Sequence, residues 1–155
     1  MLDLGTPEGV ADAFLHHGVT PADMHGISAD ELEAVYAKAY EDLDAERYDE
    51  ALDDLALLVQ QDPWEPRYQF AFALCLQYLG DAEAAGQHYA QSLLMDATNA
   101  FCTFRMGECL AALGNLTEAR DAFESTVKLS YLKNDYADVR ELAQQQLDAL
   151  ANIGA

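Results

Sequence analysis

Apolar residues follow a helical spacing along this chain. Near the C-terminus they recur at steps of three and four, which is the spacing of one face of an amphipathic helix. These residues are Tyr136, Val139, Ala143, Leu147 and Leu150. Six further helices are expected near residues 29–44, 48–60, 66–79, 82–94, 100–113 and 117–130. The pattern therefore predicts an all-α fold.

The six central helices repeat with a period of 34 residues. Four series of residues keep this spacing: two of small residues, one of bulky residues and one of aromatic residues. They are Ala39, Ala73 and Gly107; Ala51, Ala85 and Ala119; Leu55, Tyr89 and Phe123; and Tyr36, Phe70 and Phe104. A period of 34 is the signature of the tetratricopeptide repeat, in which each unit is a hairpin of two helices. The small residues are expected where two helices approach so closely that a larger side chain would force them apart.

Turn residues divide the chain into its parts. Gly80 and Gly114 mark tight turns inside the second and third repeats, because glycine adopts positive φ easily at a helix end. The first repeat lacks this glycine and turns at Glu46. The expected parts are an N-terminal helix (7–17) and linker over 1–27, three tetratricopeptide repeats over 28–132 (about 32–65, 66–99 and 100–132), and a C-terminal capping helix over 133–155.

The composition narrows the range of partners. About half of the 155 residues are apolar (51%), which is enough for a single folded domain. Eight basic and 28 acidic residues give a net charge of −20, and the field of that charge repels nucleic acid and anionic lipid surfaces. The chain does not open with a basic start and an apolar run, and no apolar run reaches the roughly 20 residues that a membrane span needs. We expect a cytoplasmic protein that binds neither nucleic acid nor membranes directly.

The sequence offers little for catalysis or metal binding. The three cysteines, Cys75, Cys102 and Cys109, lie in apolar helical stretches and are expected to be buried, reduced thiols. The histidines show no ligand spacing with cysteine or carboxylate. They are His16, His17, His25 and His88. We expect no enzyme activity, no metal and no cofactor.

The carboxylates are spread along the polar faces of the helices. Typical ones are Glu41, Asp42, Asp53, Asp54, Asp121 and Glu124. Charge runs on helices are usually solvated, so these groups are expected to act as solubilising charge. A strong net charge would also keep copies of a complex apart in solution.

The first helices of stacked hairpins line a concave groove, which is the usual binding surface of such repeats. The repeat register predicts a peptide-binding set there: Tyr36, Tyr40, Leu43, Arg67, Phe70, Leu74, Gln77, Tyr78, Phe101, Phe104, Glu108 and Ala111. Aromatic residues along a groove favour an apolar peptide segment as the ligand. Phe70 and Phe104 could equally pack between helices, whereas the hydroxyls of Tyr36 and Tyr40 suit a wet groove.

Longer stretches of the chain resemble one family. They are "FLHHGVT" ahead of the first repeat, "ISADELEAVYAKAY", "DPWEPRYQFAFALCLQYLG" and "FRMGECLAALGNLTEA". A short helix, three repeats and one trailing helix follow in this order. From about residue 10 to residue 150, the chain resembles the class II chaperones of type III secretion systems, of the SycD/LcrH type.

The resemblance implies a function and a site. It implies a small acidic bacterial chaperone that binds hydrophobic, membrane-active translocator proteins and keeps them soluble and export-competent. An extended translocator segment would lie in the concave groove. The first-repeat pocket maps to Tyr36, Tyr40 and Leu43, and the family often has an aromatic residue at the third of these places.

Two further implications concern partners. Family members often self-associate through the N-terminal region when empty, so a homodimer is expected if Val10, Phe14 and Leu15 form that face. These residues could equally fold back on the first repeat. The alternative function is a tetratricopeptide scaffold or regulatory adaptor that acts through a transcriptional activator or another cytosolic partner.

Overall fold

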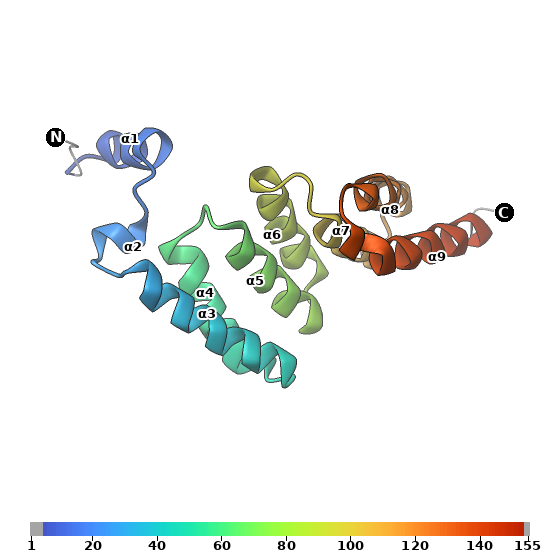
Figure 1. The fold of residues 1–155 in the computed structure, drawn as a ribbon, viewed down its shortest axis with the longest axis horizontal. Helices are drawn as coiled ribbons and strands as arrows, with labels where there is room; N and C mark the ends of the chain where they lie inside the picture. Colours follow the sequence, from blue (N-terminus) through green and yellow to red (C-terminus); the bar gives the residue numbers. More distant parts are fainter. Residues whose placement is uncertain (1–4, 154–155) are drawn as a thin grey trace. The chain divides into compact units, whose positions relative to one another are not determined.

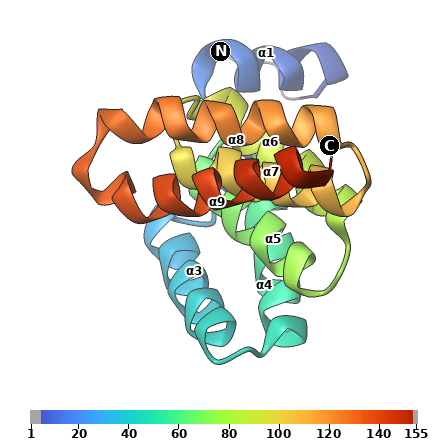
Figure 2. The same ribbon diagram turned by 90° about the vertical axis from the view of Figure 1, so that its right-hand side faces the viewer.

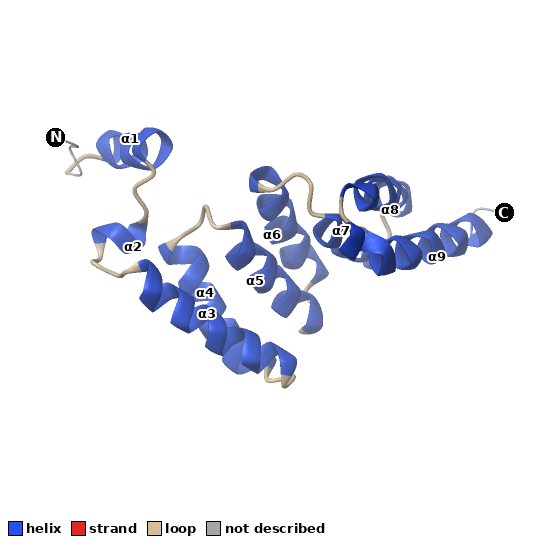
Figure 3. Cartoon of the chain, viewed as in Figure 1, coloured by secondary structure: helices blue, strands red, loops and turns tan. Residues whose placement is uncertain are grey.

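The computed structural model describes residues 5–153, except for the side chain of Phe14. This part of the chain consists of helices, turns and loops and contains no strand (Figure 3). The chain divides into two compact units, one ending at Trp64 and the other beginning at Glu65. The all-α fold predicted from the sequence is confirmed.

Within residues 5–64 the first unit contains four helices, drawn from blue to green in Figure 1. They are α1 (Pro7–His17), α2 (Pro21–Met24), α3 (Ala29–Asp44) and α4 (Tyr48–Gln61). α3 packs against α4 as the hairpin of the first repeat. Gly18, with a φ of 66°, ends α1 as expected.

The second unit contains two further hairpins and the capping helix (Figure 1). Its elements are α5 (Pro66–Tyr78), α6 (Ala82–Met95), α7 (Ala100–Ala112), α8 (Leu116–Leu129), two short 3-10 turns (Ser130–Leu132 and Asn134–Tyr136) and α9 (Ala137–Ile153). α5 packs on α6, and α7 packs on α8. The ends of the six repeat helices lie within one residue of the positions expected from the sequence.

One short helix was not expected. α2 lies in the stretch expected to be a linker, and a local capping box stabilises its start. The Thr20 hydroxyl accepts a hydrogen bond from the Asp23 amide at 3.2 Å, and the Asp23 carboxylate accepts one from the Thr20 amide at 2.8 Å. Each side chain thereby satisfies an amide that the helix start would leave without a partner.

The repeated small residues are buried as their spacing predicts. Ala39, Ala51, Ala73, Ala85 and Ala119 are all fully buried. In the second unit, Ala73 and Ala85 pack with Tyr89, and Ala119 packs with Phe123. A methyl group at these places lets the helices approach, and the bulky residues fill the adjoining space.

The capping helix α9 runs beside α8, as Figure 2 shows in red and orange. Val139, Ala143 and Leu150 bury the apolar face of α9 in the core of the third repeat. Arg140 fixes the turn between the two helices, since it donates hydrogen bonds to the hydroxyl and the carbonyl of Ser130 at 2.7 and 3.0 Å. The expected cap therefore covers the end of the third repeat.

One carboxylate read as solvated is buried. The side chain of Asp42, on α3, is 7% exposed and accepts hydrogen bonds from Arg47 at 2.6 and 2.9 Å and from Lys38 at 3.0 Å. Lys38 also reaches Asp54 on α4 at 2.8 Å. The bonds from Arg47 and then Lys38 hold the pKa of the Asp42 carboxyl below its usual value. The prediction that Asp42 is solubilising charge is wrong, because this group ties the first hairpin together.

The three hairpin turns share one backbone geometry. The residue in each turn has positive φ, and the next amide bonds back to the carbonyl five residues earlier, which is the Schellman pattern at a helix end. The residues with positive φ, again spaced by 34, are Glu46 (59°), Gly80 (90°) and Gly114 (82°). The first repeat thus keeps the turn without glycine.

Replacing Glu46 with glycine is expected to stabilise the protein by up to about 1 kcal/mol, because a side chain is disfavoured in the left-handed region. Glu41→Gly is the control, since it removes the same charge from the interior of α3 and should cost about 1 kcal/mol. Urea denaturation of the two variants measures both effects. Equal destabilisation by both substitutions would contradict this account of the turn.

Alanine substitution at Gly107 and at Gly86 should have opposite effects on stability. A Cβ at Gly107 would lie 2.6 Å from the ring of the fully buried Phe123, whereas at Gly86 the nearest atom would be 3.9 Å away. In Gly107→Ala, overpacking of about 1–3 kcal/mol should outweigh the gain in helix propensity, so the protein is destabilised. Gly86→Ala should stabilise the protein by up to about 1 kcal/mol. Midpoints of chemical denaturation decide the signs, and a stabilised Gly107→Ala would refute the close approach.

Candidate functional site

The expected binding residues lie on both units, and each unit contributes its own surface. In the first unit, Tyr36 and Tyr40 are half-buried on α3, with ring centroids 5.3 Å apart and planes inclined at 59°. Leu43 is only 7% exposed. The structure therefore corrects the prediction for Leu43, whose side chain serves the core, and leaves the two tyrosines at the surface of α3.

In the second unit, α5 and α7 contact each other and present a mixed surface, called here the α5–α7 face. It is formed by Leu74, Gln77, Tyr78, Phe101, Arg105 and Glu108. Tyr78 is 49% exposed and Phe101 is 41% exposed. The Phe101 ring also meets the Tyr136 ring edge-on, with centroids 5.1 Å apart, which holds it at one end of this face.

Other residues of the predicted set have structural contacts. Phe104 is 6% exposed and packs against Phe123, with centroids 5.6 Å apart, which favours the alternative that this ring packs between helices. Phe70 is half-buried and meets the Tyr89 ring edge-on at 5.5 Å. Both rings occupy the space beside the small residues of the repeat, which is why aromatic periodicity alone could not separate core from surface.

Arg67 lies at the start of α5. Its guanidinium bonds to Glu65 at 2.7 Å and lies 5.7 Å from the centre of the Tyr68 ring. Arg67 is exposed at the surface near the helix start.

A hydrogen-bonded chain connects α5, α6 and α7 beneath the α5–α7 face. The buried Tyr89 hydroxyl donates to the Gln77 side chain at 2.8 Å, and the Gln77 amide donates to Glu108 at 3.3 Å. Arg105 donates to the same Glu108 oxygen at 3.0 Å, and its guanidinium lies 5.9 Å from the centre of the Tyr78 ring. These contacts fix the polar groups of the face in one arrangement.

The protonation states of the groups in this hydrogen-bonded network are set by their surroundings. Burial raises the pKa of Tyr89 well above its ordinary value, so its hydroxyl remains a donor to Gln77. Burial opposes the charge on Arg105, but Glu108 and the neighbouring tyrosines outweigh it and raise the pKa of Arg105. Arg105 is therefore a permanent cation in a chain with only eight Lys and Arg residues.

Sequence analysis missed Arg105. The repeat register selected positions 101, 104, 108 and 111 and did not include position 105. A signal was present, because residue 105 follows Phe101 by four and precedes Glu108 by three, and both spacings place it on the same side of the helix.

The cysteines are buried, as predicted, and none is in a disulfide. The Cys102 thiol donates to the Tyr89 carbonyl at 3.3 Å, within the core. Among residues 5–153, no three His, Cys, Asp or Glu side chains are grouped so that they could hold a metal ion. The α5–α7 face presents aromatic rings, the Arg105 cation and hydrogen-bonding groups.

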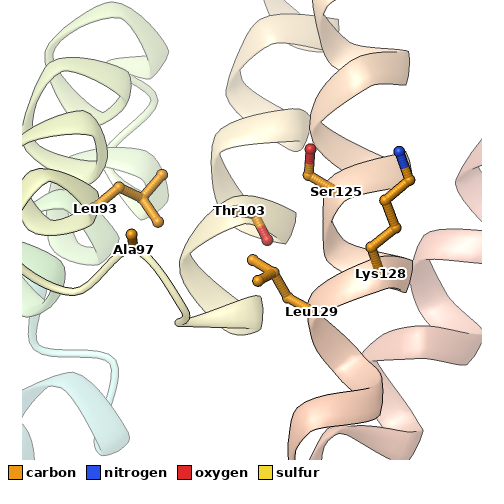
Figure 4. Close-up of a pocket in the computed structure, with 6 residues that line it drawn as sticks. All are labelled: Leu93, Ala97, Thr103, Ser125, Lys128 and Leu129. Atoms are coloured by element: carbon orange, nitrogen blue, oxygen red, sulfur yellow. The ribbon is translucent and has the colours of Figure 1, made fainter.

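An apolar pocket of about 370 Å³ lies elsewhere in the second unit (Figure 4). It is lined by Leu93, Ala97, Thr103, Ser125, Lys128 and Leu129. The Thr103 hydroxyl is already bonded to the Ala100 carbonyl and to the Thr126 hydroxyl. None of the predicted binding residues lines this pocket.

The N-terminal residues expected to mediate self-association are only partly described. On α1, Val10 is half-buried and Leu15 is 69% exposed, while the side chain of Phe14 lies outside the described part of the chain. None of the helices within residues 5–153 is long and apolar enough to cross a lipid bilayer.

Comparison with known proteins gives consistent matches. Residues 44–126 match the family model described as anaphase-promoting complex, cyclosome, subunit 3. The low calcium response locus protein H of Yersinia pestis is 26% identical over 139 residues, which cover 90% of this chain and 83% of that protein.

Two solved structures match over most of their length. A type III secretion complex from Aeromonas hydrophila contains a chain with a TM-score of 0.87 and 29% identity, over 94% of this chain and 97% of that chain. The structure of PcrH in complex with the chaperone binding region of PopD gives a TM-score of 0.81 and 29% identity, over 84% of this chain and 98% of PcrH.

Two of the cysteines should be unreactive in the folded protein. Burial raises the pKa of the Cys102 thiol to about 12 and that of the Cys109 thiol to about 11, so at pH 8 about one in a thousand or fewer is the reactive thiolate. We expect iodoacetamide to label them more than tenfold more slowly than a Ser125→Cys control in the native state, and fully in urea. Native labelling as fast as the control would contradict their burial.

Proposed function

Because the chain belongs to the SycD/LcrH-type chaperones of type III secretion, we propose that it binds hydrophobic translocator proteins and keeps them soluble and separate before export. It does so in the bacterial cytoplasm, as a binding protein and not as an enzyme. The observation that carries this proposal is the likeness to PcrH, which was solved in complex with the chaperone binding region of PopD.

The surfaces of the two units support this role. Tyr36 and Tyr40 in the first unit, and Tyr78 and Phe101 in the second, are aromatic residues that remain partly exposed. Such rings bury apolar anchors of a ligand, while a tyrosine hydroxyl tolerates contact with water. Each of these surfaces therefore suits an extended, apolar translocator segment, and the comparisons favour a chaperone over a scaffold for other cytosolic partners.

The net charge supports the proposal that the protein keeps its client soluble. A chaperone that carries an aggregation-prone client benefits from strong repulsion between copies of the complex, and the charge of −20 supplies it. Most carboxylates lie on the outer polar faces, and Asp53, Asp121 and Glu124 are exposed. We infer that solubility of the complex and affinity for the client depend on different residues.

When empty, the chaperone forms a homodimer through α1. The support for this part of the proposal is the exposed Leu15, an apolar side chain that a partner would cover. Dimer formation before client binding would protect this surface.

Binding to the chaperone binding regions of PopD and PopB tests the function by calorimetry. We expect both segments to bind the wild-type chain, and Tyr40→Ala and Tyr78→Ala to weaken binding by about 2 kcal/mol, roughly 30-fold. Tyr131→Ala is the matched control, since Tyr131 is 67% exposed outside the α5–α7 face and should leave affinity unchanged. Circular dichroism of each variant verifies the helical fold. Absence of binding to both segments would contradict the proposal.

A further inference from the structure

Arg105 has more hydrogen-bonding capacity than the protein uses. A guanidinium carries five N–H donors, and in the described part of the chain only one nitrogen of Arg105 donates, to Glu108. The side chain is 31% exposed. The remaining donors are therefore open to a ligand on the α5–α7 face.

Glu108 supplies the complementary group. One carboxylate oxygen accepts from both Arg105 and Gln77, while no described residue donates to the other oxygen. The side chain of Glu108 is 29% exposed, so this oxygen is accessible from the same surface. Donor and acceptor thus stand one helical turn apart on α7.

Both side chains are held before any ligand arrives. Arg105 lies against the Tyr78 ring, and Glu108 is fixed by Gln77, which is in turn fixed by the buried Tyr89. Fixed side chains lose little rotamer entropy on binding, so their hydrogen bonds contribute more to affinity.

The chemistry of this pair selects for a main chain over a charged side chain. An extended segment has no internal hydrogen bonds, so its N–H and C=O groups need partners when they are covered. Arg105 and Glu108 together carry no net charge, and the net charge of −20 disfavours an acidic ligand group. A neutral peptide group, with one donor and one acceptor, matches them best.

We propose that Arg105 and Glu108 clamp the main chain of the bound segment, Arg105 donating to a carbonyl oxygen and Glu108 accepting from an amide N–H. The clamp deepens the proposed function and rests on it. It secures any extended apolar segment regardless of its side chains, while the neighbouring aromatic rings select the anchors.

The test is an amide-to-ester scan of the PopD segment, because an ester lacks the N–H donor and has a weaker carbonyl acceptor. At one or two positions, the ester should weaken binding to the wild-type chain about tenfold. The same ester should change binding to Arg105→Ala or Glu108→Ala by less than about twofold. Arg120→Ala and Glu124→Gln, which make matched charge changes on exposed positions of α8, should keep the tenfold effect. Arg105→Lys retains the charge but loses the planar set of donors. The effect of the ester on its binding should therefore lie between the effects on wild type and on Arg105→Ala.

Three other outcomes would overturn the clamp. If wild type binds but no ester position is coupled to either residue, the chaperone function stands and the clamp is wrong. If neutralising an acidic or basic side chain of the segment removes the effect of Arg105→Ala, the pair recognises that side chain instead. If the wild-type chain binds neither the PopD nor the PopB segment, the proposed function fails and the clamp fails with it.

Discussion

The close approach of paired helices at small residues is the constraint on which the rest of the structure depends. Ala51, Ala85 and Ala119 are fully buried at intervals of 34 residues. In the third repeat the contact is closer still, since Gly107 leaves no room for a Cβ beside Phe123. Tight hairpins in the second unit bring α5 and α7 together, and only then can Gln77 on one helix bond to Glu108 on the other.

The α5–α7 face of the second unit follows from how the close helix packing distributes side chains. Bulky rings such as Tyr89 and Phe123 are used inside, so the face is left with partly exposed rings and a fixed polar chain. The buried Tyr89 hydroxyl couples core and surface, because its partner Gln77 also positions Glu108. The packing that stabilises the fold therefore also preorganises the face on which we propose that the extended ligand binds.

Much of the fold could be predicted from the sequence, because a repeated period carries the same information several times. The ends of the six repeat helices were correct to within one residue, and the buried thiols and the cap were also anticipated. Features that depend on a single neighbour were not predictable. Asp42 is buried because Arg47 lies across the turn, and Glu46 takes positive φ because the turn requires it.

The candidate site was harder to predict for a related reason. Helical periodicity places Leu43 and Phe104 on the inward side, but it does not show how deep each side chain lies. The structure finds both buried. Arg105 was missed because the repeat pattern describes small and bulky positions. What distinguishes Arg105 is its hydrogen bond to Glu108 and its contact with the Tyr78 ring.

The most direct measurement is site-specific photo-crosslinking to a co-expressed translocator, with p-benzoylphenylalanine placed at position 40, 78 or 131. The account predicts crosslinks to the translocator from position 40 and from position 78, and none from position 131. Crosslinks from position 131 alone, or from none of the three while the complex forms, would contradict binding at the first helices of the repeats.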